Sequence, residues 1–239
     1  MLTQSTRMVE SRWRDLYRIG GVSCLLLAGL VAFAVIAYSI WPYAPGFAST
    51  EAIFVTLNTD RLGALFSLDV MMLVTAPIDI FLFITLYAAL KRVNESYALI
   101  ALVLGLMAIA LLIPTKPLAE LVFLSEQYAA ATTEAARSQY LAAGEALLTL
   151  AGGTAWIVFS LFSNISFLLS SLLMLRSTDF DKATAYIGIV NSIFALGIII
   201  PVFAIAAICG LGTTIVGTIW FVLLGRNFLR LEKEARRLA

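Results

Sequence analysis

The stretch of residues 62–90 constrains the fold most strongly, because it is long, apolar and contains two acids. Apart from Asp69, Pro77 and Asp79, every residue in it is apolar, small or hydroxylated. About 20 apolar residues are enough to cross a bilayer as a helix. An ionised carboxylate near the bilayer centre costs about 2.5–3.5 kcal/mol on the lenient insertion scale. We therefore expect a membrane-spanning helix whose two carboxyl groups face protein, water or a ligand.

The rest of the chain repeats this apolar pattern. Hydrophobic residues make up 61% of the 239 residues and charged residues 13%, whereas soluble domains are roughly 45–50% apolar and 25% charged. The apolar runs follow one another with short gaps, which leaves no room for a second, soluble domain. The sequence therefore predicts an all-α polytopic membrane bundle of six transmembrane helices. Their expected ranges are 19–41, 62–90, 97–113, 146–175, 183–207 and 213–231.

The placement of Lys and Arg predicts how these helices are oriented. Thirteen of the sixteen lie in the lead 1–18, in the second-to-third and fourth-to-fifth turns, or in and beside the tail 232–239. The other three, Arg61, Lys116 and Arg137, lie in the opposite loops. The positive-inside rule places the larger group in the cytoplasm. We therefore expect a multi-pass protein of the cytoplasmic (inner) membrane, with both termini inside and the lead at the membrane interface.

The largest polar excursion is the segment 118–144, between the third and fourth spans. Leu118 and Leu121 are spaced as on one face of a helix, which predicts an amphipathic helix lying on the outer surface. Thr132 or Thr133 is expected to cap the helix that follows and continues into the fourth span.

Prolines and glycines predict where the helices bend, approach one another or reverse. Pro77 predicts a kink near Leu73 in the second span. Gly152 and Gly153 predict a notch in the fourth span, in which a neighbouring backbone can approach closely. The glycines within 210–212 predict the reversal between the fifth and sixth spans.

Asp79, Asn164 and Asn191 are candidate members of a mid-membrane polar cluster. Each lies eight to eleven residues from the expected inner end of its span, which places all three about 12–17 Å from the cytoplasmic face. We expect them to join the second, fourth and fifth spans. The cluster is either an interhelical hydrogen-bonding contact or a substrate or proton site.

Asp69 and Glu145 are candidates for a second, outer polar site. Asp69 is ten residues from Asp79, so the two carboxyl groups lie about 15 Å apart along a helix and cannot act as a pair. Neither aspartate has an obvious Lys or Arg partner within the spans. This argues for neutral acids and against a buried salt bridge.

The residue types exclude several kinds of chemistry. The chain has no His, the commonest metal ligand and general base. The aspartates of the spans have no His, Lys or paired Cys to supply a base and nucleophile. We therefore expect no catalytic residue, no metal and no cofactor. The net charge of +1 gives no indication of a nucleic-acid partner.

Two classes of function remain open. The first is a non-enzymatic accessory or scaffold subunit of a membrane assembly, which contacts membrane lipids and other membrane subunits or copies of itself. The alternative is a small transporter, or a lipid- or small-molecule-binding membrane protein, that uses the mid-membrane cluster around Asp79.

Three segments of the chain carry a resemblance to a known family. They are Tyr17-Arg18-Ile19-Gly20-Gly21, Leu86-Tyr87-Ala88-Ala89-Leu90-Lys91 followed by Val93-Asn94, and Trp220-Phe221-Val222-Leu223-Leu224-Gly225. With them the chain resembles the uncharacterised bacterial six-helix membrane proteins catalogued as domain of unknown function 4386. The resemblance covers most of the chain, and it implies a six-helix fold and no particular activity.

Overall fold

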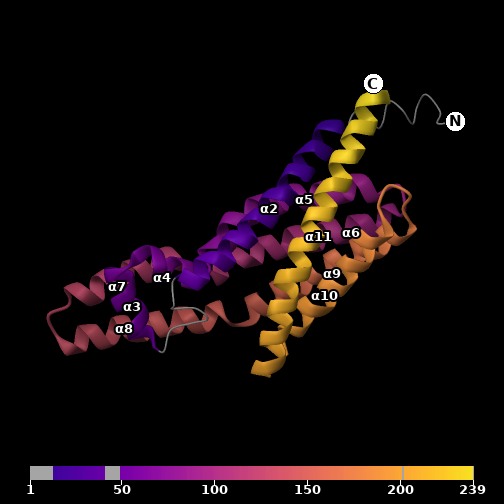
Figure 1. Ribbon diagram of the computed structural model, residues 1–239. Helices are drawn as coiled ribbons and strands as arrows, with labels where there is room; N and C mark the ends of the chain where they lie inside the picture. The colour runs from indigo at the N-terminus through magenta and orange to yellow at the C-terminus, as the bar shows by residue number, and fades with distance from the viewer. Residues whose placement is uncertain (1–12, 41–48, 201, 239) are drawn as a thin grey trace. The chain divides into compact units, whose positions relative to one another are not determined.

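The computed structural model describes residues 13–40, 49–200 and 202–238, and every regular element in these residues is a helix (Figure 1). The expected all-α class is confirmed. The elements are α2 (Arg14–Ile40), α3 (Thr50–Thr59), α4 (Arg61–Ser67), α5 (Val70–Leu90), α6 (Glu95–Leu112), the 3-10 turn η1 (Ile113–Thr115), α7 (Leu118–Ala130), α8 (Glu134–Ala151), α9 (Thr154–Arg176), α10 (Lys182–Gly197) and α11 (Phe203–Leu238).

The chain divides into two compact units. Unit 1 consists of Met1–Val31, Pro77–Ile109 and Ser160–Ala239, and unit 2 of Ala32–Ala76 and Ala110–Phe159. Within the described residues, five helical segments are long and apolar enough to cross a membrane. They are Arg14–Ala37, Val70–Leu90, Glu95–Ala130, Glu134–Arg176 and Ala204–Arg237.

The predicted boundary between the fifth and sixth spans is wrong. We expected the chain to reverse at 210–212, but α10 ends at Gly197 and α11 runs through these positions from Phe203. Gly212 instead lies against a neighbouring ring, because an added Cβ would come within 2.6 Å of Phe194 Cδ1 on α10. This glycine serves close helix packing rather than a turn.

Both ends of the chain differ in extent from the expected lead and tail. Residues 1–12 of the predicted lead lie outside the described residues, and α2 already begins at Arg14. The predicted tail is the last part of α11 up to Leu238, and position 239 lies outside the described residues. An i,i+4 ion pair of 3.1 Å between Arg236 and Glu232 supports this helical continuation.

Unit 1 is packed around the fully buried Trp220 of α11. The Phe167 ring of α9 meets the Trp220 ring edge-on at 5.2 Å, and the Phe83 ring of α5 stacks on Phe167 at 5.0 Å. Such pairs contribute about 0.5–1.5 kcal/mol each beyond their buried area. Gly105 of α6 and Gly188 of α10 leave the room that the Phe83 and Trp220 rings occupy. Aromatic rings against glycines therefore hold these helices together.

Helix α2 joins this core through small residues. Thr85 Oγ1 of α5 donates a hydrogen bond of 3.3 Å to the Leu16 carbonyl, and Gly20 leaves room for the threonine. On α11, a Cβ added at Gly225 would lie 3.1 Å from the Gly21 carbonyl oxygen. The first turns of α2 therefore lie beside the last turns of α5.

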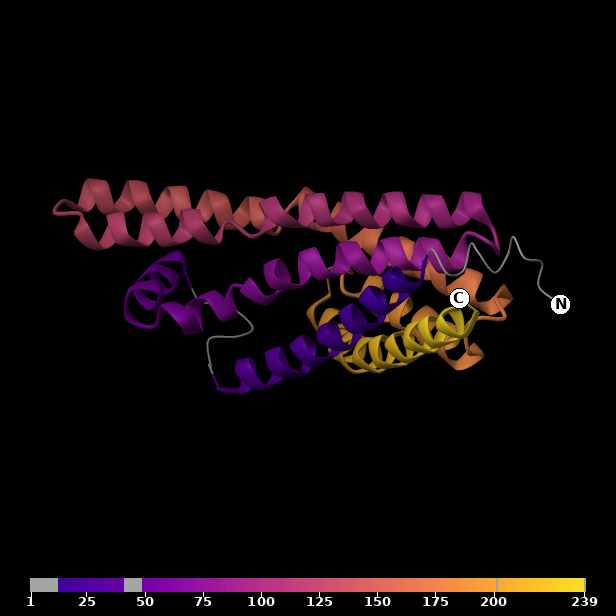
Figure 2. The same cartoon turned by 90° about the horizontal axis from the view of Figure 1, so that it is seen from above.

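Unit 2 is built on the antiparallel hairpin of α7 and α8, which run side by side in both views (Figures 1 and 2). Thr133 caps α8 as expected, because its hydroxyl accepts a 3.2 Å hydrogen bond from the Ala136 amide. Helix α3, which was not expected, buries Phe54 and Leu57 in a cluster with Leu121 of α7. The hairpin and α3 thus share one small hydrophobic core.

The packing of unit 1 is tested by replacing Gly188 with Ala. The new Cβ would collide with Ser171 Oγ and lie 2.5 Å from Trp220 Nε1, so we expect a loss of about 1–3 kcal/mol. The melting temperature of the purified protein in detergent should fall. Gly210→Ala is the matched control, because nothing lies within 4 Å of its added Cβ. Equal melting temperatures for the two variants would contradict the described packing.

Candidate functional site

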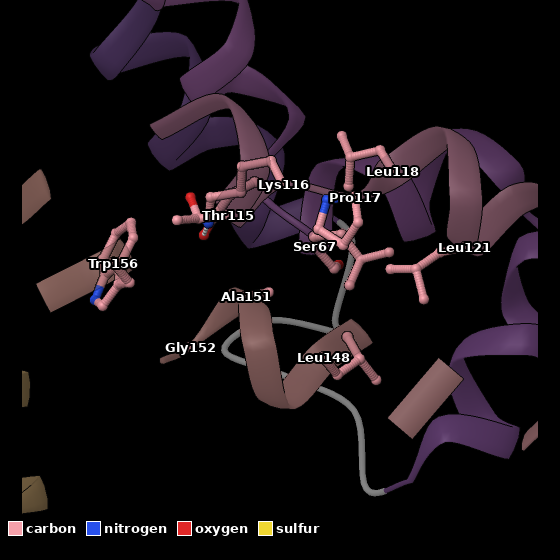
Figure 3. Close-up of a pocket in the computed structure, with 12 residues that line it drawn as sticks. Ser67, Thr115, Lys116, Pro117, Leu118, Leu121, Leu148, Ala151, Gly152 and Trp156 are labelled. Atoms are coloured by element: carbon pink, nitrogen blue, oxygen red, sulfur yellow. Dashed lines mark hydrogen bonds and ion pairs between the residues drawn. The ribbon is translucent and has the colours of Figure 1, made fainter. Parts of the chain in front are cut away.

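Three interruptions of regular helix in unit 2 line one pocket (Figure 3). They lie at 68–69 between α4 and α5, at 113–117 between α6 and α7, and at 152–153 between α8 and α9. The pocket has a volume of about 410 Å³, within the roughly 300–1,000 Å³ typical of small-molecule sites. It is lined by Ser67, Leu68, Asp69, Thr115, Lys116, Pro117, Leu118, Leu121, Leu148, Ala151, Gly152 and Trp156.

The first interruption is made by Asp69, which has a left-handed backbone conformation with φ of 63°. A residue in this conformation commonly ends a helix, and Asp tolerates it better than most residues. Its amide donates to the Phe66 carbonyl at 3.0 Å, closing α4. We expected one helix over 62–90 with a kink near Leu73. In the structure the helix is instead interrupted at Asp69, and α5 continues through Pro77 without a break.

The second interruption follows from two prolines. Pro114 and Pro117 have no amide hydrogen to donate, and α6 gives way to the short turn η1. The buried Thr115 hydroxyl donates a 2.6 Å hydrogen bond to the Leu112 carbonyl, which satisfies part of the helix end. Lys116 follows directly and contributes to the pocket lining.

The third interruption corrects the expected notch at Gly152 and Gly153. Gly152 ends α8, and its amide donates to the Leu148 carbonyl at 3.2 Å. The atoms nearest to a Cβ added at Gly153 are the carbonyl oxygens of Thr149 and Leu150, both at 3.2 Å. The glycine pair therefore separates two helices, and among the described residues the atoms nearest to both added Cβ positions belong to α8 itself.

A Lys–Asp ion pair lies in the pocket. Lys116 Nζ is 2.8 Å from Asp69 Oδ2, and the Lys116 side chain is 12% exposed while that of Asp69 is 44% exposed. The expectation that no basic partner would reach this aspartate is wrong. The same ammonium lies 4.8 Å from the Trp156 ring centroid, within the range of a cation–π contact. The interruption at 113–117 thus supplies the cation that the span sequences lack.

The rest of the lining is mixed. The Ser67 hydroxyl oxygen is buried and has no hydrogen-bond partner among the residues that the structure describes. Figure 3 shows Trp156 at one end of the pocket and Leu118 and Leu121 at the other, with Leu148 at the edge. The pocket therefore offers a charged pair, one spare hydroxyl and apolar walls.

Glu145, the other candidate of the outer site, is exposed on α8 and does not belong to the lining. The structure does not bring it to Asp69 in this pocket. The residues that the sequence reasoning missed are Lys116 and Trp156. One signal in the sequence could have indicated them. The prolines at 114 and 117 and the glycine pair at 152–153 all interrupt helices near the outer side of the expected membrane.

The three mid-membrane candidates all lie in unit 1. Asp79 is half-buried on α5. The buried Asn164 amide donates at 2.7 Å to a carbonyl of its own helix. Asn191 Oδ1 is buried with no hydrogen-bond partner in the described ranges, and it lies 3.0 Å from where a Cβ at Gly217 would lie. No hydrogen bond described in the structure joins any two of the three, so their cluster stays a prediction.

The chain matches no protein-family model, no curated protein and no solved structure. The feature of the described residues that most suggests a function is the pocket in unit 2, with its ion pair held where three helices are interrupted.

The ion pair is tested by removing each charge separately and both together. Asp69→Asn keeps a residue that tolerates the left-handed conformation but leaves the nearly buried Lys116 ammonium without its partner, so we expect a loss of about 1–3 kcal/mol. Lys116→Met should cost less, because the half-exposed Asp69 remains hydrated.

The double variant should recover most of the loss caused by Asp69→Asn. Thermal unfolding in detergent of all three variants and the original protein measures the coupling. Strictly additive shifts in melting temperature would show that the two side chains do not interact.

Proposed function

We propose that the protein is an integral membrane protein that crosses the bilayer six times with both termini in the cytoplasm. The five long apolar helices support membrane insertion. Helix α10, with 16 residues, is close to the lower limit of about 17 residues for a spanning helix. It packs along α11 through Gly197 and Gly212, which supports a place within the bundle. In this arrangement the hairpin of α7 and α8 lies on the outer side of the membrane, and the apolar face of α7 packs against α3.

Reporter fusions test this topology. Between position 132 and the C-terminus lie α9, α10 and α11, so three crossings place these points on opposite sides. Alkaline phosphatase inserted at 132 should be active, because its disulfides form outside the cytoplasm, and green fluorescent protein at the C-terminus should fluoresce. If α10 did not cross, both points would lie on the same side and one reporter would be silent.

We further propose that the protein binds a small zwitterion in the unit 2 pocket, as a transporter or a ligand-binding membrane protein. The observation that carries this proposal is the convergence of three helix interruptions on the Asp69–Lys116 pair. Irregular backbone at membrane depth is tolerated where it is covered by protein or lines a water-filled cavity. Transporters place their substrates at such discontinuous helices.

Charge balance favours a zwitterion over an ion of either sign. A ligand carboxylate on Lys116 and a ligand ammonium on Asp69 would turn one ion pair into two. A simple cation would compete with the nearly buried Lys116 ammonium for the Asp69 carboxylate, and a simple anion would be repelled by that carboxylate. The Trp156 ring and the leucines of the lining would hold the apolar part of the ligand.

Ligand-induced thermal stabilisation tests this proposal. In a panel of amino acids and other small zwitterions, those that bind should raise the melting temperature of the original protein. A ligand at 100 times its Kd adds about 2.7 kcal/mol to the free energy of unfolding. Asp69→Asn and Lys116→Gln should abolish the shift. Asp79→Asn is the control and should keep it. Loss of the shift only in Asp79→Asn would instead locate the site at the mid-membrane cluster.

The accessory-subunit function is the second candidate. The exposed apolar side chains of the described residues favour it, but the glycines Gly20, Gly105 and Gly188 pack against side chains within unit 1. Native mass spectrometry of gently extracted protein distinguishes the two functions. A stable complex with another membrane subunit would favour the accessory function, and a single chain that binds zwitterions would favour the binding protein.

A further inference from the structure

Two grooves on unit 1 share one design. The first, of about 470 Å³, lies between α2 and α5 and has Arg18 with apolar walls that include Val22, Leu26 and Phe81. The second, of about 440 Å³, lies between α6 and α9 and has Arg176 with walls that include Leu172. Each groove thus lies between two helices, has mostly apolar walls and contains one arginine.

The two arginines lie at the same end of unit 1. Arg18 is in the second turn of α2, which lies beside the last turns of α5 through the Thr85–Leu16 hydrogen bond. Helix α6 begins at Glu95, shortly after α5 ends, and the Ser166 hydroxyl of α9 donates to a carbonyl of α6 at 2.5 Å. Arg176, the last residue of α9, therefore lies at the end where α5 finishes and α6 starts.

Both guanidinium groups are available to a ligand. Arg18 and Arg176 are exposed, and neither makes a hydrogen bond or an ion pair within the part of the chain that the structure describes. Asp15 also lines the first groove, but its carboxylate is 3.2 Å from the Arg14 guanidinium. The charge left at the end of each groove is positive.

The walls of the grooves are of the kind that lipid chains cover. Val22, Leu26 and Phe81 are 45%, 53% and 46% exposed, and Leu172 is 44% exposed. Exposed apolar side chains on a membrane bundle face lipid acyl chains. The guanidinium at the end of each groove can bind phosphate oxygens by paired, charge-assisted hydrogen bonds. Tyr97 in the second groove adds an aromatic ring of the type enriched at membrane interfaces.

We propose that each groove binds one anionic phospholipid of the leaflet at this end, with an acyl chain in the groove and the phosphate on Arg18 or Arg176. The positive charge at each groove selects the anionic headgroup, as basic sites between membrane helices do. The proposal rests on the membrane insertion of unit 1 and not on the zwitterion pocket of unit 2. Lipid binding can therefore fail while the reporter fusions still show six spans.

Native mass spectrometry of the full chain in detergent tests the proposal with two lipids of identical acyl chains. Dioleoyl phosphatidylglycerol should bind with two molecules retained per chain, and dioleoyl phosphatidylcholine should bind about tenfold more weakly, because its choline ammonium offsets the phosphate charge and is repelled by the arginine. Arg18→Gln and Arg176→Gln should each remove one retained molecule.

Arg226→Gln is the matched control, because Arg226 is an exposed arginine of α11 that lines neither groove. It should leave two molecules bound. Leu26→Trp fills the first groove without changing charge and should also remove one molecule, which separates groove binding from simple charge attraction. Three results would overturn the proposal. They are equal binding of the two lipids, loss of a molecule also in Arg226→Gln, and two molecules retained by the double variant Arg18→Gln/Arg176→Gln.

Discussion

A charge can persist in an apolar helical bundle only where another charge or water reaches it. In unit 2 this condition is met at Lys116, whose nearly buried ammonium lies 2.8 Å from the Asp69 carboxylate. The ion pair forms where the regular helix is interrupted both at Asp69 and at Lys116. Asp69 takes a left-handed conformation, and Lys116 lies between Pro114 and Pro117. The pocket exists because these breaks, and the one at 152–153, leave space that a continuous helix would fill.

Unit 1 follows the opposite principle. Its helices are held by the series of rings from Phe83 through Phe167 to Trp220 and by glycines that let neighbours approach. Such contacts need no charge, and they favour a rigid, dry interior. This packing also encloses buried serine, threonine and asparagine side chains, and among the described residues Asn191 Oδ1 and Trp220 Nε1 find no hydrogen-bond partner. The chain thus combines a unit held by rings and glycines with a unit that carries a charged cavity.

The sequence predicts what is local and misses what depends on distant partners. The apolar runs predict membrane-length helices, and the threonines at 132 and 133 predict a helix start that the structure places at Thr133, because these signals lie within a few residues. The Asp69–Lys116 pair joins positions 47 residues apart, so only the fold reveals it. Glycine is ambiguous for a physical reason, since it permits both turns and close packing. For this reason the sequence predicts close packing at 152–153, where the structure has a helix break. It predicts a turn at 210–212, where the structure has a continuous helix with Gly212 packed against Phe194.

We propose that the pocket beside Asp69 and Lys116 is open to water and to a small ligand. The most direct test is the reactivity of a cysteine at Ala151, which lines the pocket, in a chain whose two native cysteines are replaced by alanine. A membrane-impermeant thiol reagent should label Ala151→Cys from outside, and a bound zwitterion should slow the labelling. Ser171→Cys, fully buried in unit 1, should stay unlabelled. Labelling of Ala151→Cys no faster than of Ser171→Cys would contradict the account.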